Sequence, residues 1–368
     1  MTANIFYVSI ILVVVCMKNL FKYFIIGCKV LLSNGLLIVL LINFSLISNI
    51  VYKAINNKNK LEKYESLKTE IEEKIENKIV IENTTPNIDE PKGVTKITIC
   101  LKSPISKEEL SENLLNISNE LENYMNSSNL NFAFKYKDLY TGFSLSYNSN
   151  QPIFAASTIK APEAIYIYEE SEKGNINLEN SIKYTPNYYS NGTGILKNTA
   201  FNKDYTIRRL VEYSIIHSDN AAHLMLNEKY NPQNIYNFWK EKGTTSIYKS
   251  NTAWGDINAN DATIYMEELY NYYLTNTDNS KELIKYFESS WKVISSPNNS
   301  IIASKSGWAS NSLHDVALIF DENPYILVIL SNRGNAEYTS YFNRISNLIY
   351  KFHHTYWEEK ISKCTINN

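Results

Sequence analysis

Three short polar motifs, far apart in the chain, most constrain its fold. They are residues 157–160 (Ser-Thr-Ile-Lys), residues 218–220 (Ser-Asp-Asn) and residues 305–307 (Lys-Ser-Gly). The pattern Ser-x-x-Lys also occurs at residues 246–249 and 289–292, but only the first copy follows an extended segment and opens a helical pattern. A serine at a helix N-terminus lies beside free backbone N–H groups, with a lysine three residues later on the same face. If the motifs form one site, the fold has to bring three distant segments to one point.

The first two motifs have the residue types that acyl transfer through a serine needs. A serine hydroxyl is a poor nucleophile until a base takes its proton, and a lysine in a dry, cationic pocket is shifted toward the neutral amine. Lys160 is therefore the predicted base for the nucleophile Ser157. Ser218 is predicted to pass a proton to the leaving nitrogen, and Asn220 to hydrogen-bond the amide of the substrate.

The third motif is predicted to bind the substrate. Lys305 and Ser306 offer a positive charge and a hydroxyl to a substrate carboxylate. Gly307 is expected to leave room for the substrate along a strand edge, because it has no side chain to block the backbone.

The three motifs in this order resemble those of the penicilloyl-serine transferase superfamily, and most closely class A β-lactamases, over roughly residues 105–360. In residues 215–222 a helical run ends in the second motif and restarts with small residues, as in that family. Residues 191–196 resemble the family's loop beside the active site, with Tyr188 or Tyr189 as its flanking aromatic.

The resemblance implies both a fold and an oxyanion hole. The fold is an α+β sandwich of αβα layers, with a five-stranded antiparallel sheet and a helical subdomain. The oxyanion hole consists of the main-chain N–H groups of Ser157 and Trp308. The terminal elements pack together in this fold, so a disulfide between Cys100 and Cys364 is one hypothesis.

Hydrophobic patterns agree with an α+β sandwich, because strands lie at both ends of the domain around a helical centre. The predicted elements are a helix over 107–126, strands near 131–137, 142–148, 300–306, 312–320 and 325–331, and a closing helix over 338–359.

One feature of class A β-lactamases has no counterpart in this sequence. Their loop between the second and third motifs carries a glutamate that positions the deacylating water, but residues 244–261 contain no glutamate. Asp256 and Asp261 are the only acids in this stretch, and a loop aspartate is more often a turn former or cap than a base. Hydrolysis of an acyl-serine is therefore expected to be slow, because acylation and deacylation have separate barriers.

Three functions remain open from the sequence. One is a serine hydrolase that β-lactam amides acylate at Ser157 and that hydrolyses them slowly. Another is a D-alanyl-D-alanine peptidase, a penicillin-binding protein that acts on peptidoglycan stem peptides. The third is a membrane-tethered β-lactam sensor without turnover. No cofactor or metal is predicted, because the five histidines lack ligand spacing, and 36 basic against 38 acidic residues give no reason to expect nucleic-acid binding.

The N-terminal region is predicted to attach the enzyme to the cell membrane. Residues 1–52 form the expected anchor: residues 30–52 carry no charge and are long enough to span a bilayer. An uncharged run over 3–17 would make the anchor a hairpin, unless Met17 is the true start. A charged helical stalk and linker follow over 53–93, with an apolar stripe that suits a weak dimer. The catalytic domain, residues 94–368, is expected outside the cytoplasmic membrane, where β-lactams and wall peptides are met.

Overall fold

The structure is a computed structural model. It describes residues 80–83, 100, 109–128, 130–248, 252–295, 297–298, 300–334 and 338–366. All of them lie in the unit Lys74–Asn368. The predicted anchor, and the predicted stalk and linker apart from residues 80–83, lie outside the described residues. No helix within the described part of the chain is long and apolar enough to cross a membrane.

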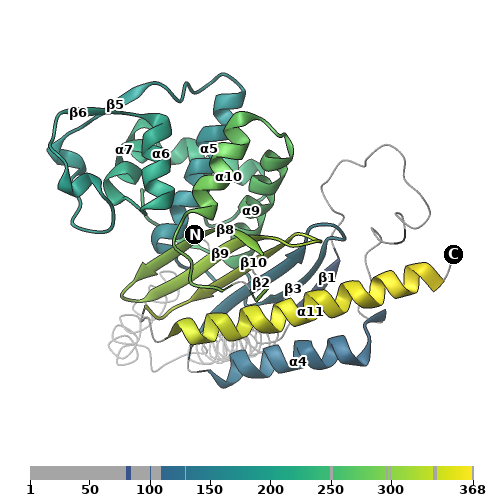
Figure 1. The fold of residues 1–368 in the computed structure, drawn as a ribbon. Coiled ribbons are helices and arrows are strands. Elements are labelled where there is room, and N and C mark those ends of the chain that lie inside the picture. The colour runs from purple at the N-terminus through teal and green to yellow at the C-terminus, as the bar shows by residue number, and fades with distance from the viewer. Residues whose placement is uncertain are drawn as a thin grey trace, which may run out of the picture. The chain divides into compact units, whose positions relative to one another are not determined.

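An antiparallel sheet forms the middle layer of the described chain (Figure 1). Its order is β1-β3-β2-β10-β9-β8. The strands are β1 (Val80–Asn83), β2 (Phe132–Asp138), β3 (Phe143–Tyr147), β8 (Ile301–Ala309), β9 (Ser312–Phe320) and β10 (Tyr325–Ser331). The five predicted strands are confirmed.

The sixth strand, β1, corrects the expectation for the segment before the domain. Its residues were assigned to a helical stalk and linker, but they pair with β3, with Val80 opposite Ser146. An unpaired edge strand exposes a row of N–H and C=O groups, and β1 satisfies those of β3 on this side. The sheet therefore begins before residue 94.

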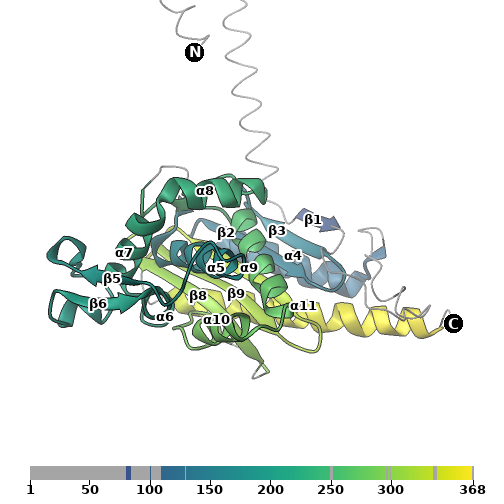
Figure 2. The same cartoon turned by 90° about the horizontal axis from the view of Figure 1, so that it is seen from above.

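Helices cover both faces of the sheet, as an αβα sandwich requires. On one face lie α4 (Glu112–Ser127) and α11 (Thr339–Ile366), which run side by side (Figure 1). The other face carries the helical region (Figure 2). Its longer helices are α5 (Lys160–Glu172), α6 (Ile207–Ile216), α7 (Asn220–Tyr230), α8 (Pro232–Glu241), α9 (Ala259–Leu274) and α10 (Asp278–Glu288).

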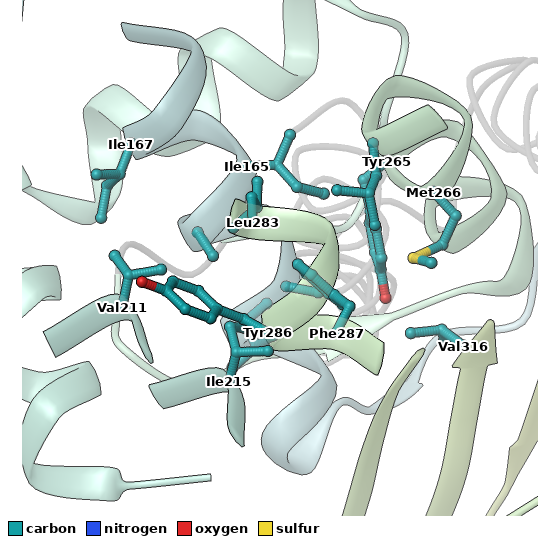
Figure 3. Close-up of a cluster of buried hydrophobic side chains, with 14 of the residues drawn as sticks. Ile165, Ile167, Val211, Ile215, Tyr265, Met266, Leu283, Tyr286, Phe287 and Val316 are labelled. Carbon is teal, nitrogen blue, oxygen red and sulfur yellow. The ribbon is translucent and has the colours of Figure 1, made fainter. Parts of the chain in front are cut away.

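Strand β10 shows why the sheet is buried on both sides. Successive side chains of a strand point to opposite faces. Leu327 and Ile329 belong to the apolar core under α4 and α11, whereas Ile326, Val328 and Leu330 belong to the core under the helical region. A strand that is covered on both faces has a continuous apolar sequence. The helical region is anchored through the same core, where side chains of α5, α6, α9 and α10 gather above β9 (Figure 3).

The two terminal helices of the domain are joined in several ways. Helix α4 begins later than predicted because Ser111 caps it and accepts a hydrogen bond from the backbone N–H of Leu114. The Ser111 hydroxyl also donates to Glu359 of α11, over 2.7 Å. The predicted disulfide between Cys100 and Cys364 is present, with a Cα–Cα distance of 5.7 Å. Helix α11 therefore continues past residue 359 to the cysteine that closes the domain.

Candidate active site

The first motif lies at a junction between a strand and a helix, as the sequence predicted. Strand β4 (Ile153–Phe154) pairs with β7 (Asp256–Ile257), and the chain then enters the 3-10 turn η2 (Ala156–Ile159), which leads directly into α5. Ala156, just before the serine, has a φ of 46°. Thr158 stabilises the turn, since its backbone N–H and its hydroxyl both donate to the Ala155 carbonyl oxygen.

Gly307 brings strand β8 against this turn. A Cβ atom at Gly307 would lie 2.9 Å from the Ala155 carbonyl oxygen and 3.1 Å from the backbone nitrogen of Thr158. We expected the glycine to leave room for a substrate, but the turn that carries Ser157 fills the space of the missing side chain. The absence of a side chain thus sets the distance between the first motif and the third.

Lys160 joins the first motif to the second. Its Nζ lies 3.2 Å from Ser157 Oγ and 3.3 Å from Ser218 Oγ. The ammonium also donates to the Ser218 carbonyl oxygen and to Asn220 Oδ1, each over 2.6 Å. The third motif reaches the same point, because Lys305 Nζ lies 3.2 Å from Ser218 Oγ. All three motifs therefore meet around Ser218.

Burial changes the acidity of both lysines. Lys160 is fully buried and Lys305 is 2% exposed. Loss of solvation, and then the charge of Lys305, hold the pKa of Lys160 well below its usual value, although Asp219 and Glu163 oppose the shift. Loss of solvation lowers the pKa of Lys305 to about 8, against the opposing charge of Asp315. The lowered pKa of Lys160 favours its neutral amine, as a general base requires.

Asp219 positions the second motif, and our sequence analysis gave it no role. It is the N-cap of α7, where its Oδ1 accepts hydrogen bonds from the N–H groups of Ala221 and Ala222. Its Oδ2 accepts from the N–H groups of Ile195 and Leu196 in the neighbouring loop. One carboxylate thus ties the loop over residues 191–196 to the Ser-Asp-Asn motif. An aspartate just before a helical pattern is the N-cap signal that could have indicated this role.

A cavity of about 440 Å³ opens beside the serine. Ser157, Asn220 and Trp308 line it among the predicted site residues. Its other lining residues are Phe154, Ala156, Gly192, Thr193, Trp254, Ala309 and Ser310. Tyr188 and Tyr189 are not among them, and the Tyr189 hydroxyl donates to Asn191 instead. The Ser306 hydroxyl donates to the Trp291 carbonyl oxygen over 2.8 Å.

No aspartate or glutamate of the described chain lines this cavity. Asp256 is exposed on β7 and is not a lining residue. Asp261 is buried and accepts hydrogen bonds from the backbone N–H groups of Thr245 and Ser246. It therefore holds the loop before β7 to the start of α9.

The other two Ser-x-x-Lys copies lie outside the cluster. The hydroxyl of Ser246 donates to Asp261, over 2.5 Å. Ser289 ends helix α10, and the nearby Lys292 donates to two backbone carbonyl oxygens, those of Glu288 and Ser290. The tertiary structure thus distinguishes the first copy from the others by its partners.

The fold and the arrangement of motifs define the class of protein. The chain is similar to PBP-A, with 17% identity and a TM-score of 0.57 over 65% of this chain and 96% of that chain. It is also similar to a β-lactamase from Sphaerobacter thermophilus DSM 20745, with 15% identity and a TM-score of 0.57 over 63% of this chain and 95% of that one. A β-lactamase from Chitinophaga pinensis DSM 2588 is similar as well, with 15% identity and a TM-score of 0.58 over 64% of this chain and 98% of that one. These likenesses show a β-lactamase-like fold.

The family follows from the sequence model. The model of the β-lactamase enzyme family matches residues 116–353, and the chain belongs to that family. A search of curated proteins finds no match.

Proposed function

We propose that this protein is an active-site-serine hydrolase that β-lactam amides acylate at Ser157. The observation that carries the proposal is the distance of 3.2 Å between Nζ of the buried Lys160 and Ser157 Oγ. A lysine with a lowered pKa at hydrogen-bond distance is the arrangement that activates a serine. Membership of the β-lactamase enzyme family supports the same chemistry.

Acylation uses the three motifs in sequence. Neutral Lys160 takes the proton of Ser157 as Oγ attacks the carbonyl carbon of the lactam, and the carbonyl becomes an oxyanion. The backbone N–H groups of Ser157 and Trp308 are proposed to bind this oxyanion. The C–N bond of the lactam then breaks, and the leaving nitrogen takes a proton from Ser218. Ser218 regains a proton from one of the two lysines, which lie 3.2 Å and 3.3 Å from its oxygen.

The remaining predicted residues orient the substrate. Asn220 lines the cavity, and its Oδ1 is occupied by Lys160, so its amide nitrogen is the group left to bind a carbonyl of the substrate. Lys305 is the proposed partner of a substrate carboxylate, with Ser306 beside it. An ammonium group that is desolvated in this way binds an anion more strongly than one in water.

Slow deacylation is the second part of the proposal. Hydrolysis of the acyl-serine needs a base that activates water, and the cavity is lined by no carboxylate of the described chain. This favours a second candidate function, a penicillin-binding protein that acts on peptidoglycan stem peptides and forms long-lived adducts with β-lactams. A structure of a PBP-A mutant shows an acyl-enzyme complex with penicillin G, and that protein covers 66% of this chain at 18% identity.

We further propose that residues 1–52 anchor the protein in the cell membrane, with the catalytic domain outside. The disulfide between Cys100 and Cys364 supports this location, because disulfides persist in oxidising compartments. Accessibility of the domain to protease in intact cells would test it. A domain that is cleaved only after the cells are opened would contradict the proposal.

The decisive experiment follows the intact mass of the full-length chain after mixing with penicillin G. We expect a mass increase of one penicillin that persists and is absent in Ser157→Ala. Ser289→Ala, which changes another Ser-x-x-Lys copy, serves as the matched control and should label normally. A short-lived adduct with rapid drug hydrolysis would indicate an efficient β-lactamase. Labelling that survives Ser157→Ala would refute the assignment of the nucleophile.

A further inference from the structure

Trp254 occupies the side of the cavity next to the proposed base. It lines the cavity together with Ser157. Its ring centroid lies 5.5 Å from Lys160 Nζ, so the indole covers the ammonium group on the side that faces the cavity. Trp254 belongs to the short segment before β7, within the stretch 244–261 that contains no glutamate.

A buried pair of ionisable groups holds this segment in place. His223 of α7 and Glu163 of α5 are both fully buried. His223 Nδ1 lies 2.8 Å from Glu163 Oε2, and Nε2 lies 2.8 Å from the carbonyl oxygen of Ala253, the residue before the tryptophan. The imidazole also touches the indole, with 4.8 Å between the ring centroids.

The hydrogen-bond partners determine how protons are distributed in this pair. A carbonyl oxygen only accepts, so Nε2 has to carry a hydrogen. A single proton then lies between Nδ1 and the Glu163 carboxyl group, and the pair is neutral overall whichever group holds it. Because the two groups are partners and Nε2 also has an acceptor, the pair is buried without an unpaired charge. The contact can therefore persist in the interior and position the tryptophan.

We propose that Trp254 keeps water away from Lys160 and from the acylated Ser157, and so sets the lifetime of the acyl-enzyme. His223 and Glu163 act as positioning residues for the indole. This inference rests on the proposed acylation of Ser157 and adds to it the cause of slow deacylation.

The chemistry of the second step explains why an indole has this effect. In deacylation a water oxygen attacks the carbonyl carbon of the ester, and a base takes one of its protons. The bond between that carbon and Ser157 Oγ breaks, Oγ regains a proton, and the product leaves as a carboxylic acid. An indole occupies the volume that the water needs and has no lone pair to accept its proton.

The test separates the two covalent steps in the full-length chain, with penicillin G as the probe. Intact mass gives the rate of adduct formation and, after removal of free drug, the rate of adduct decay. We expect Trp254→Glu to speed decay of the formed adduct by about 10²-fold or more, since a general base contributes about that much. Trp254→Phe keeps an aromatic ring and should keep the long lifetime. Trp254→Leu is the variant to use if the glutamate variant fails to fold; its smaller side chain should admit water to the cavity and give a moderate increase in decay.

His223→Ala tests the positioning role through a double-mutant cycle. It should speed decay in the native background, because Ala253 loses its hydrogen-bond donor and the indole is released. In a Trp254→Ala background the same change should add nothing, whereas a general structural role would lower activity in both. Thermal melting of each variant confirms that it is folded.

The outcomes distinguish this inference from the proposed function. If the native chain forms no adduct, the proposed function fails and the inference fails with it. If the adduct forms but all folded Trp254 variants decay at the native rate, the proposed function stands and the inference is wrong. Faster decay in Trp254→Glu with Trp254→Phe unchanged supports both.

Discussion

Two buried polar clusters lie on opposite faces of the same sheet, and their buried ionisable groups have different hydrogen-bond partners. The site cluster consists of Lys160, Ser218 and Lys305, beside the cavity. The clamp cluster consists of Asp138 and Trp357, which join β2 to α11. Lys160 and Asp138 are both fully buried. The comparison shows which buried polar groups serve the fold and which serve chemistry.

In the clamp cluster the charged group is supplied with donors. Asp138 accepts hydrogen bonds from the backbone N–H groups of Tyr140 and Thr141, from the Thr141 hydroxyl, and from Trp357 Nε1 over 2.8 Å. His353 nearby is neutral, because burial lowers its pKa to about 3. Such a satisfied network fixes the position of α11 against the sheet.

In the site cluster two lysine amines are buried close together. Among the described residues, Lys160 and Lys305 hydrogen-bond hydroxyl, carbonyl and amide oxygens, and neither forms a salt bridge. Burial without an ion pair costs stability and lowers the pKa of both lysines. Perturbed groups of this kind gather where chemistry needs them. Burial also raises the pKa of Asp138, so perturbed groups occur in both clusters, and it is the cavity beside the lysines that distinguishes the site cluster.

The largest expected effect comes from removing the proposed general base of the site cluster, Lys160. Lys160→Met should slow acylation by roughly 10²–10⁴-fold, because no other amine contacts Ser157 Oγ among the described residues. The midpoint of thermal unfolding should stay level or rise, since an apolar side chain replaces a fully buried ionisable one. Quenched-flow mass spectrometry measures the acylation rate, and calorimetry measures the midpoint of thermal unfolding. Acylation within tenfold of the native rate would require a different base.

The second effect breaks the clamp cluster and leaves the site intact. Asp138→Ala should lower the free energy of unfolding by about 1–3 kcal/mol, because it leaves several buried donors without an acceptor. The acylation rate of the folded protein should not change. Asp321→Ala is the matched control, since Asp321 pairs with the partly exposed His354 on the same helix and should cost less than about 1 kcal/mol. Equal losses of unfolding free energy in the two variants would show that the clamp cluster stabilises the fold no more than a partly exposed ion pair does.

The smallest expected effect is the dependence of acylation on pH through Lys305 of the site cluster. Lys305 binds a carboxylate only as a cation, and its pKa is about 8, so acylation by penicillin G should decline as the pH rises through that value. One pH unit above the pKa the decline should be about tenfold, since about a tenth of the group remains charged. Lys305→Arg keeps its charge and should remove the decline, even if its overall rate is lower. If the arginine variant shows the same decline, another group controls it.

Much of the architecture follows from local patterns. The five predicted strands appear within three residues of their predicted limits, because alternating or continuous apolar runs are short-range signals. The junction at Ser157 follows from an extended run that meets a helical one. Helix limits were less accurate: Ser111 starts α4, and α11 continues to Ile366. Caps and long-range contacts decide such ends, and a periodic pattern does not contain them.

Other features have no local signal. Strand β1 ends a charged segment with a helical period, and its apolar residues Val80 and Ile81 are too few to indicate a strand; it forms because β3 offers it an edge. Nothing around Trp254 or His223 in the sequence indicates that they meet Lys160 and Glu163. The role of Gly307 also depends on a neighbour that is far away in the chain, the turn at Ala155.

The sequence by itself determined the motifs, their order, the spacing of Ser157 and Lys160 on one turn, and the α+β pattern around them. These depend on chemistry and geometry within a few residues of the chain. The tertiary structure alone decided that Ser218 and Lys305 reach Lys160, that both lysines lose their solvent, and that an indole faces the base. Desolvation and contact arise only when distant segments pack together, and in this protein they turn three common motifs into one site.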